Sequence, residues 1–94
     1  MDLAAFLLAR LDTVAGIAQR EAASPPVIGG VLATVFTPER VLAEVAAKRG
    51  IIALHTSASD GCTTCGEPWP CTTLRLVAGP YHAHPDFRPE WSLA

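Results

Sequence analysis

A cluster of cysteines constrains this chain more than any other feature of its sequence. All three cysteines, Cys62, Cys65 and Cys71, lie within one short stretch, and His55 stands a few residues before the first of them. A C-x-x-C pair on a tight turn brings two sulfur atoms within reach of one ion, and Gly66 lets the backbone fold back as metal knuckles require. Because a tetrahedral ion needs four ligands, the pattern predicts a metal site made of His55 and the three cysteines.

Other interpretations of the same residues stay open at this stage. His82 and His84 are rivals of His55 for the fourth ligand position. His55 also suits a polar cap at the negative end of a helix, and reduced cysteines are often buried as small hydrophobic residues. A chain of 94 residues buries a smaller share of its surface on folding than a larger domain does, however, and small domains often add a metal or disulfides. An odd number of cysteines leaves one thiol over from any disulfide framework.

The donor set favours zinc as the metal. Three thiolates and one imidazole form a closed site, and closed zinc sites are structural rather than catalytic. The spacing C-x2-C-x5-C also resembles the three downstream cluster cysteines of the WhiB-like regulators of actinobacteria. An iron–sulfur cluster is therefore the alternative cofactor. Those regulators carry a fourth cysteine well upstream, and this chain has none before Cys62.

Two amphipathic patterns precede the cysteine cluster. Apolar residues at steps of three or four predict a helix over 3–22, with Asp2 as its cap. A second helix is expected over 38–55, because Thr37 is a good cap for its first turn. Between them, the segment 27–36 is β-branched and contains Gly-Gly, so a short β-hairpin and an extended segment are both open. Its apolar character also makes it a candidate homodimer contact.

The second helix has a predicted inner face and one predicted surface pair. Glu44 and Lys48 stand four residues apart, in the order that favours an ion pair. The residues expected to face the core are Val41, Leu42, Val45 and Ile52, together with Ala46 and the stem of Arg49.

The carboxyl-terminal part is expected to fold as a loop, a short helix and a tail. The metal-knuckle loop covers 55–71, and a third helix over 72–79 turns Leu74, Leu76 and Val77 inward. The tail over 80–94 carries aromatic residues that close the core, and Pro85 is expected to open one more helical turn. The prediction is a mainly α, single small domain over 1–94, with two longer antiparallel helices, the metal-knuckle loop and the short third helix.

Composition disfavours several classes of protein. The net charge of −2 and the absence of a basic block argue against nucleic-acid binding, for which the candidate residues are Arg40, Lys48, Arg49 and Arg75. The amino terminus has Asp2 where a signal peptide would carry Lys or Arg, and charged residues soon interrupt its apolar run, so we expect a cytoplasmic protein with no membrane span. No paired carboxylates, catalytic triad or phosphate-binding loop stands out, so we do not expect an enzyme.

A resemblance to a known family supports the same four residues. The segments 38–55, 62–81 and 84–91, together with the start "FLLARLD", are similar to a family of short proteins of unknown function from actinobacteria and their phages. Relatives have a helix ending in histidine, a C-x-x-C loop, a Pro-Cys-x-Thr-Leu-Arg segment and a His-Pro-Asp-aromatic tail ending in Trp. The resemblance implies that His55, Cys62, Cys65 and Cys71 form one site, and it implies no activity. The segment 22–37 departs from the family pattern.

These observations predict a small zinc-binding interaction module with no enzymatic activity. We expect it to bind a protein partner in a regulatory role. The candidate contact residues are Trp69 and Arg49, and Trp69 is also a candidate cover for the metal knuckle. The alternatives are an iron–sulfur or thiol redox sensor and, less favoured, a nucleic-acid-binding protein.

Overall fold

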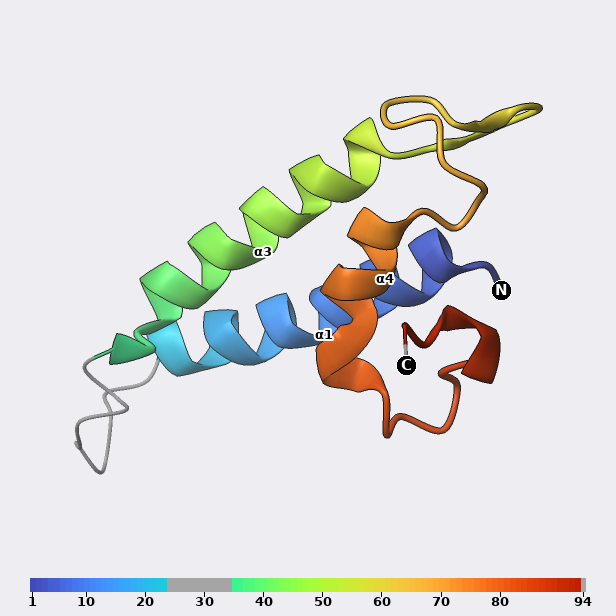
Figure 1. The fold of residues 1–94 in the computed structure, drawn as a ribbon. Coiled ribbons are helices and arrows are strands. Elements are labelled where there is room, and N and C mark those ends of the chain that lie inside the picture. Colours follow the sequence, from blue (N-terminus) through green and yellow to red (C-terminus); the bar gives the residue numbers. More distant parts are fainter. Residues whose placement is uncertain (24–34, 94) are drawn as a thin grey trace.

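The computed structural model describes residues 1–23 and 35–93, and these form a mainly helical fold, as predicted, with one very short hairpin (Figure 1). The predicted hairpin or dimer contact at 27–36 lies almost entirely outside these residues. In chain order the elements are α1 (Leu3–Ala22), α3 (Pro38–Leu54), β1 (Ser57–Ala58), β2 (Gly61–Cys62), α4 (Thr72–Ala78) and the 3-10 helices η1 (Gly79–Tyr81) and η2 (Pro89–Trp91).

Helix α1 spans the residues expected of it and begins at the expected cap. The Asp2 carboxylate accepts a hydrogen bond from the Ala5 N–H at 2.8 Å, which satisfies one of the free donors of the first turn. Ile17, one of the apolar residues whose spacing predicted this helix, is exposed. The buried stripe is made of Leu3, Phe6, Leu7, Leu11, Ala15 and Ala18.

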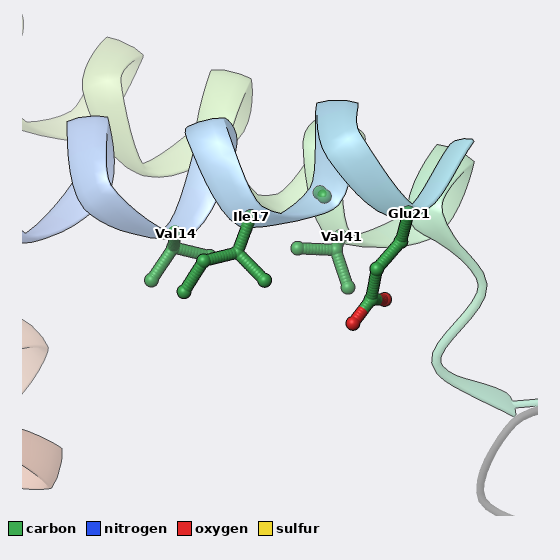
Figure 2. Close-up of a pocket in the computed structure, with 5 residues that line it drawn as sticks. Val14, Ile17, Glu21 and Val41 are labelled. Carbon is green, nitrogen blue, oxygen red and sulfur yellow. The ribbon is translucent and has the colours of Figure 1, made fainter. Parts of the chain in front are cut away.

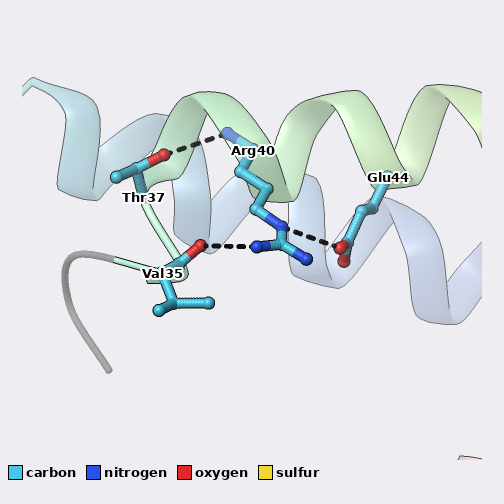
Figure 3. A network of polar contacts seen from close by, with 4 residues as sticks. All are labelled: Val35, Thr37, Arg40 and Glu44. Carbon is cyan, nitrogen blue, oxygen red and sulfur yellow. Dashed lines mark hydrogen bonds and ion pairs between the residues drawn. The ribbon is translucent and has the colours of Figure 1, made fainter. Parts of the chain in front are cut away.

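Helix α3 begins at Thr37, whose hydroxyl accepts from the Arg40 N–H at 3.2 Å (Figure 3). The Arg40 guanidinium then donates to the Glu44 carboxylate at 3.2 Å and to the Val35 carbonyl at 3.3 Å. The predicted pair of Glu44 with Lys48 is therefore replaced by a pair with Arg40. The planar guanidinium of Arg40 bonds the carboxylate and the Val35 carbonyl at once.

Helices α1 and α3 lie antiparallel and form the longest contact in the fold, while α4 packs across them near one end (Figure 1). Val45 and Ile52 are the buried side chains of α3. Ala46 and Arg49, expected to face inward, are exposed. Arg49 donates instead to the Asp12 carboxylate at 2.7 Å and so ties α3 to α1 at the surface.

The third helix and the tail complete the core. Leu74 is buried and Val77 is half-buried, whereas Leu76 is 62% exposed, contrary to the prediction. The extra helical turn occurs at Pro89–Trp91 rather than after Pro85. It places the buried Trp91 ring against Phe6 of α1, with the ring centroids 5.2 Å apart.

Beyond α4, the paired helices α1 and α3 share a small apolar pocket of about 120 Å³ (Figure 2). Pockets that enclose a small molecule usually have about 300–1,000 Å³. The lining residues are Val14, Ile17, Ala18, Glu21 and Val41.

Among the described residues, none of the helices combines the length and the apolar character needed to cross a membrane.

Candidate metal centre

His55 enters the site from the end of α3. It is the C-cap residue of this helix, and its N–H donates to the carbonyls of Ile51 and Ile52 at 3.2 Å. Its backbone has already left the helical conformation, with φ −108° and ψ 86°. The chain therefore turns away at His55, and its half-buried imidazole is left facing the loop that follows.

Cys62 and Cys65 are positioned by a hairpin that the sequence did not predict. Strands β1 and β2 pair antiparallel, with Ser57 opposite Cys62. After β2 the chain folds back, and the Gly66 N–H donates to the Cys62 carbonyl at 2.9 Å. Gly66 has φ +74°, which glycine adopts without the steric cost of a side chain. This is the turn that the C-x-x-C-Gly pattern predicts.

Gly61 is a second glycine on which the loop depends, and sequence reasoning missed it. Its φ is +115°, and a Cβ built there would lie 2.6 Å from the Glu67 carbonyl oxygen. That oxygen accepts a hydrogen bond from the Cys62 N–H at 2.8 Å. The close approach of the two backbone segments fixes Cys62 in place, and it leaves no room for a side chain at Gly61.

Cys71 enters from the start of α4, where it is the N-cap residue and completely buried. Its side chain makes no capping hydrogen bond. The carboxylate of Glu67 takes that role, because it accepts from the Thr72 hydroxyl at 2.6 Å and from the Thr72 N–H at 3.3 Å. These two bonds lower the pKa of Glu67, and the Cys71 sulfur is left available for a ligand. A glutamate shortly before a helix start was the only sequence signal for this cap.

The four predicted ligands come together at this point. The ligand atoms of His55, Cys62, Cys65 and Cys71 all lie within 4.8 Å of one another. The Nδ1 atom of His55 is 3.3 Å from the Cys62 sulfur and 3.5 Å from the Cys71 sulfur. Cys62 and Cys71 are buried, whereas Cys65 is exposed. The group is compact enough to bind one metal ion.

Hydrogen bonds at the knuckle prepare one thiol for metal binding. Burial by itself would raise the pKa of Cys62, but hydrogen bonds from the backbone of Cys65 and Thr64, the Cys65 thiol and His55 together lower it to about 6. The pKa of Cys65 is raised, because burial and its bonds to the other two thiols outweigh a hydrogen bond from the Glu67 backbone. Since thiolates are the form that binds metals, this lowered pKa favours Cys62 as a metal ligand at neutral pH.

The rival histidines lie elsewhere. The His82 side chain is exposed and lies 3.1 Å from the Gly79 carbonyl. His84 stacks its ring edge against Phe6, with centroids 5.4 Å apart, and contacts Arg10. Trp69 is half-buried and packs against the core.

Comparison with known proteins assigns the family but no activity. No curated protein and no solved structure matches the chain. A family model described as "Family of unknown function (DUF6221)" matches residues 1–93. Because this match extends over nearly the whole length, the chain belongs to the family of unknown function DUF6221.

Proposed function

We propose that the protein is a small zinc-binding interaction module without enzymatic activity. The observation that carries the proposal is the convergence of four ligand atoms within 4.8 Å. Tetrahedral zinc, with bonds of about 2.3 Å to sulfur and 2.0–2.1 Å to nitrogen, separates its ligands by about 3.8 Å for two sulfurs and about 3.6 Å for sulfur and nitrogen. The distances from His55 Nδ1 to Cys62 and Cys71, 3.3 and 3.5 Å, fit these values.

The same geometry disfavours an iron–sulfur cluster. The cysteines of a [4Fe–4S] cluster are each attached to a different iron ion, and those of a [2Fe–2S] cluster are divided between two iron ions, so the whole set of sulfur atoms spreads farther than around a single ion. Ligand atoms confined within 4.8 Å suit one ion better. Three thiolates and one imidazole would also fill all four positions of a zinc ion, which leaves no open position for a substrate.

When bound, zinc would join three separate parts of the fold. His55 ends α3, Cys62 and Cys65 belong to the hairpin knuckle, and Cys71 begins α4. Without the ion, α3 and α4 touch each other only lightly. In this proposal the ion holds the knuckle as a rigid surface, and the free energy of zinc binding becomes part of the folding free energy.

We further propose that this rigid end binds a protein partner in a regulatory role. Leu54, which is 64% exposed, precedes the ligand His55, and its carbonyl accepts from the Thr64 hydroxyl of the knuckle. An exposed leucine held against an ordered loop is a suitable apolar contact. Trp69 is half-buried and offers less area, and the Arg49 guanidinium is already paired with Asp12. The setting that we propose is the actinobacterial cytoplasm, for a protein encoded by the bacterium or by one of its phages.

Nucleic-acid binding remains the less favoured proposal. Of the basic residues considered for it, Arg40 and Arg49 are engaged by Glu44 and Asp12. The Arg75 guanidinium donates to the backbone carbonyls of Trp91 and Ser92. Phosphate contacts need side chains whose charge is not already balanced or committed to the fold.

Elemental analysis tests the metal assignment. Protein purified anaerobically without added metal is expected to contain about one zinc ion per chain, because one tetrahedral zinc ion uses all four ligands. Cys65→Ser is the best variant, because the Cys65 side chain is exposed and its loss creates no cavity. His82→Asn, which changes an exposed histidine outside the cluster, is the matched control. Zinc should be lost in the first variant and kept in the second. Iron, or no metal in the unaltered protein, would contradict the proposal.

A redox sensor is a second candidate, favoured by the exposure of Cys65. Two metal-bound thiolates would give two electrons to a peroxide, forming one disulfide bond and releasing zinc, while the peroxide takes up two protons and becomes two molecules of water. The test is to titrate the zinc protein with hydrogen peroxide and to measure the released ion with a chromophoric chelator. Release of one zinc ion per disulfide, reversed by a dithiol, would support a sensor, and resistance to millimolar peroxide would exclude it.

A further inference from the structure

Glu67 contacts the metal centre through three separate groups, although it is not one of the proposed ligands. It stands two residues after Cys65 and four before Cys71, in the loop that joins the knuckle to α4. The residue is exposed, so it adds nothing to the hydrophobic core. Its contacts with the neighbours of the ligands therefore need a reason other than burial.

The backbone of Glu67 holds the two cysteines of the knuckle. Its carbonyl oxygen accepts from the Cys62 N–H at 2.8 Å. The same oxygen is the atom that leaves no room for a side chain at Gly61. The Glu67 backbone also donates a hydrogen bond to Cys65, and such a donor favours the thiolate form that binds metals. The peptide groups on either side of Glu67 thus fix Cys62 and orient Cys65.

The carboxylate of Glu67 acts on the third cysteine through the start of α4. Both hydrogen bonds from Thr72 end on one oxygen, Oε2, at 2.6 Å from the hydroxyl and 3.3 Å from the N–H. Thr72 is the first residue of α4, and it directly follows Cys71, whose own side chain makes no capping bond. The carboxylate therefore supplies the acceptor that a helix start needs, and it fixes the backbone from which Cys71 projects.

We propose that Glu67 is a positioning residue that holds all three thiols in place for the metal. This inference rests on the proposed zinc site and names the residue that prepares it. A loop that must order itself around an ion loses part of the binding free energy to that ordering. Glu67 lowers this cost, because it ties the knuckle to α4 so that the ligand atoms stay within 4.8 Å of one another.

In this role Glu67 needs the position of one oxygen rather than its charge. The carboxylate also attracts Arg75 and His55, but the charge of an exposed residue is screened by water. Glutamine has one carbonyl oxygen, which can accept both bonds from Thr72 as Oε2 does. Alanine has no acceptor. The two substitutions therefore separate the acceptor from the charge.

Zinc affinity of the full-length protein tests the role of Glu67, measured anaerobically by competition with a chromophoric chelator. Glu67→Ala should bind zinc about tenfold to a hundredfold more weakly than the unaltered protein, the range typical of residues that orient metal ligands. Glu67→Gln should bind zinc nearly as tightly as the unaltered protein. Glu21→Ala removes an exposed glutamate at the end of α1, and this matched control should leave the affinity unchanged.

A second readout shows whether the thiols themselves move. Co²⁺ in place of zinc gives visible bands that depend on the ligands and on their geometry. These bands should shift and weaken in Glu67→Ala and should be kept in Glu67→Gln. A residue that only stabilised α4 would change the stability to urea and leave the cobalt bands unchanged.

Thr72→Val keeps the question answerable should Glu67→Ala fail to fold, because it removes only the hydroxyl donor. It should weaken zinc binding by itself. In a Glu67→Ala background it should have no further effect, since the bond that it removes is already lost.

Two results would overturn the role of Glu67. One is equal zinc affinity and equal cobalt spectra in Glu67→Ala and Glu21→Ala. The other is a Glu67→Gln protein that binds zinc as weakly as Glu67→Ala, because the charge rather than the acceptor would then matter. Failure of the proposed function looks different, since the unaltered protein would itself bind neither zinc nor cobalt.

Discussion

The substitution Gly61→Ala examines the link between backbone geometry and the metal site. A methyl group at this position would lie 2.6 Å from the Glu67 carbonyl oxygen, which is closer than real Cβ atoms approach any backbone atom. That same oxygen holds the Cys62 N–H at 2.8 Å. The backbone at Gly61 and the backbone at Glu67 must therefore move apart, and this contact is the one that positions the ligand Cys62. Gly66→Ala is the matched control, because its Cβ would meet no atom within 4 Å.

The expected loss of zinc-binding free energy in Gly61→Ala is the sum of two costs. Holding alanine at φ +115° costs about 1–3 kcal/mol, and weakening the Cys62 hydrogen bond adds about 1 kcal/mol. For Gly66, at φ +74° with open space, only a strain of about 1–2 kcal/mol remains. In a metal-free loop that can relax, these costs fall mainly on zinc binding. We expect Gly61→Ala to bind zinc about tenfold more weakly than Gly66→Ala, since about 1.4 kcal/mol is a factor of ten.

The assay is competition for zinc with a chromophoric chelator, under anaerobic conditions at pH 7. Dissociation constants of the unaltered protein and the two variants are compared, with circular dichroism to confirm that α1 and α3 remain helical. Equal zinc affinities for the two variants would refute the reasoning. The hairpin around Gly61 would then not be what positions Cys62.

Three further predictions concern electrostatics and packing. In metal-free protein, thiolate absorbance near 240 nm should show one group titrating at about pH 6 that disappears in Cys62→Ser, because hydrogen bonds lower this pKa from its ordinary value of 9.0. Between pH 6 and 9 the unfolded chain binds this proton and the folded chain does not. Metal-free protein should therefore become more stable to urea as the pH rises through that window, and it should lose this contribution as the pH falls through 6. A free energy of unfolding that does not change with pH would contradict this prediction. Phe6→Ala should cost about 3–5 kcal/mol in urea unfolding, because the ring is 1% exposed and contacts four other rings; a loss below 1 kcal/mol would show that the tail does not pack there. Asp12→Asn removes the exposed pair with Arg49 and should cost at most about 1 kcal/mol, an effect that 1 M salt should remove.

Local sequence was sufficient for the features that depend on neighbouring residues. The caps Asp2 and Thr37 accept the hydrogen bonds expected of them, because a side-chain oxygen three residues before a free N–H needs no tertiary partner. The helical stripe of α1 and the turn at Gly66 follow from periodicity and from conformational freedom in the same way. Within ten residues, C-x2-C-x5-C leaves its sulfur atoms little freedom to separate, so the proximity of the ligands could also be anticipated.

The tertiary structure decided between residues that the sequence alone could not distinguish, as ion-pair partners, as buried side chains or as metal ligands. Glu44 could pair with either neighbouring cation, and the position of the Val35 carbonyl favours Arg40. Leu76 is as apolar as Leu74, yet it is exposed, because only one face of the short α4 helix meets α1 and α3. Likewise, three histidines could have served the cysteines. His55 lies beside them because α3 ends there, whereas His84 is held against Phe6 of α1 by long-range packing that no local pattern records.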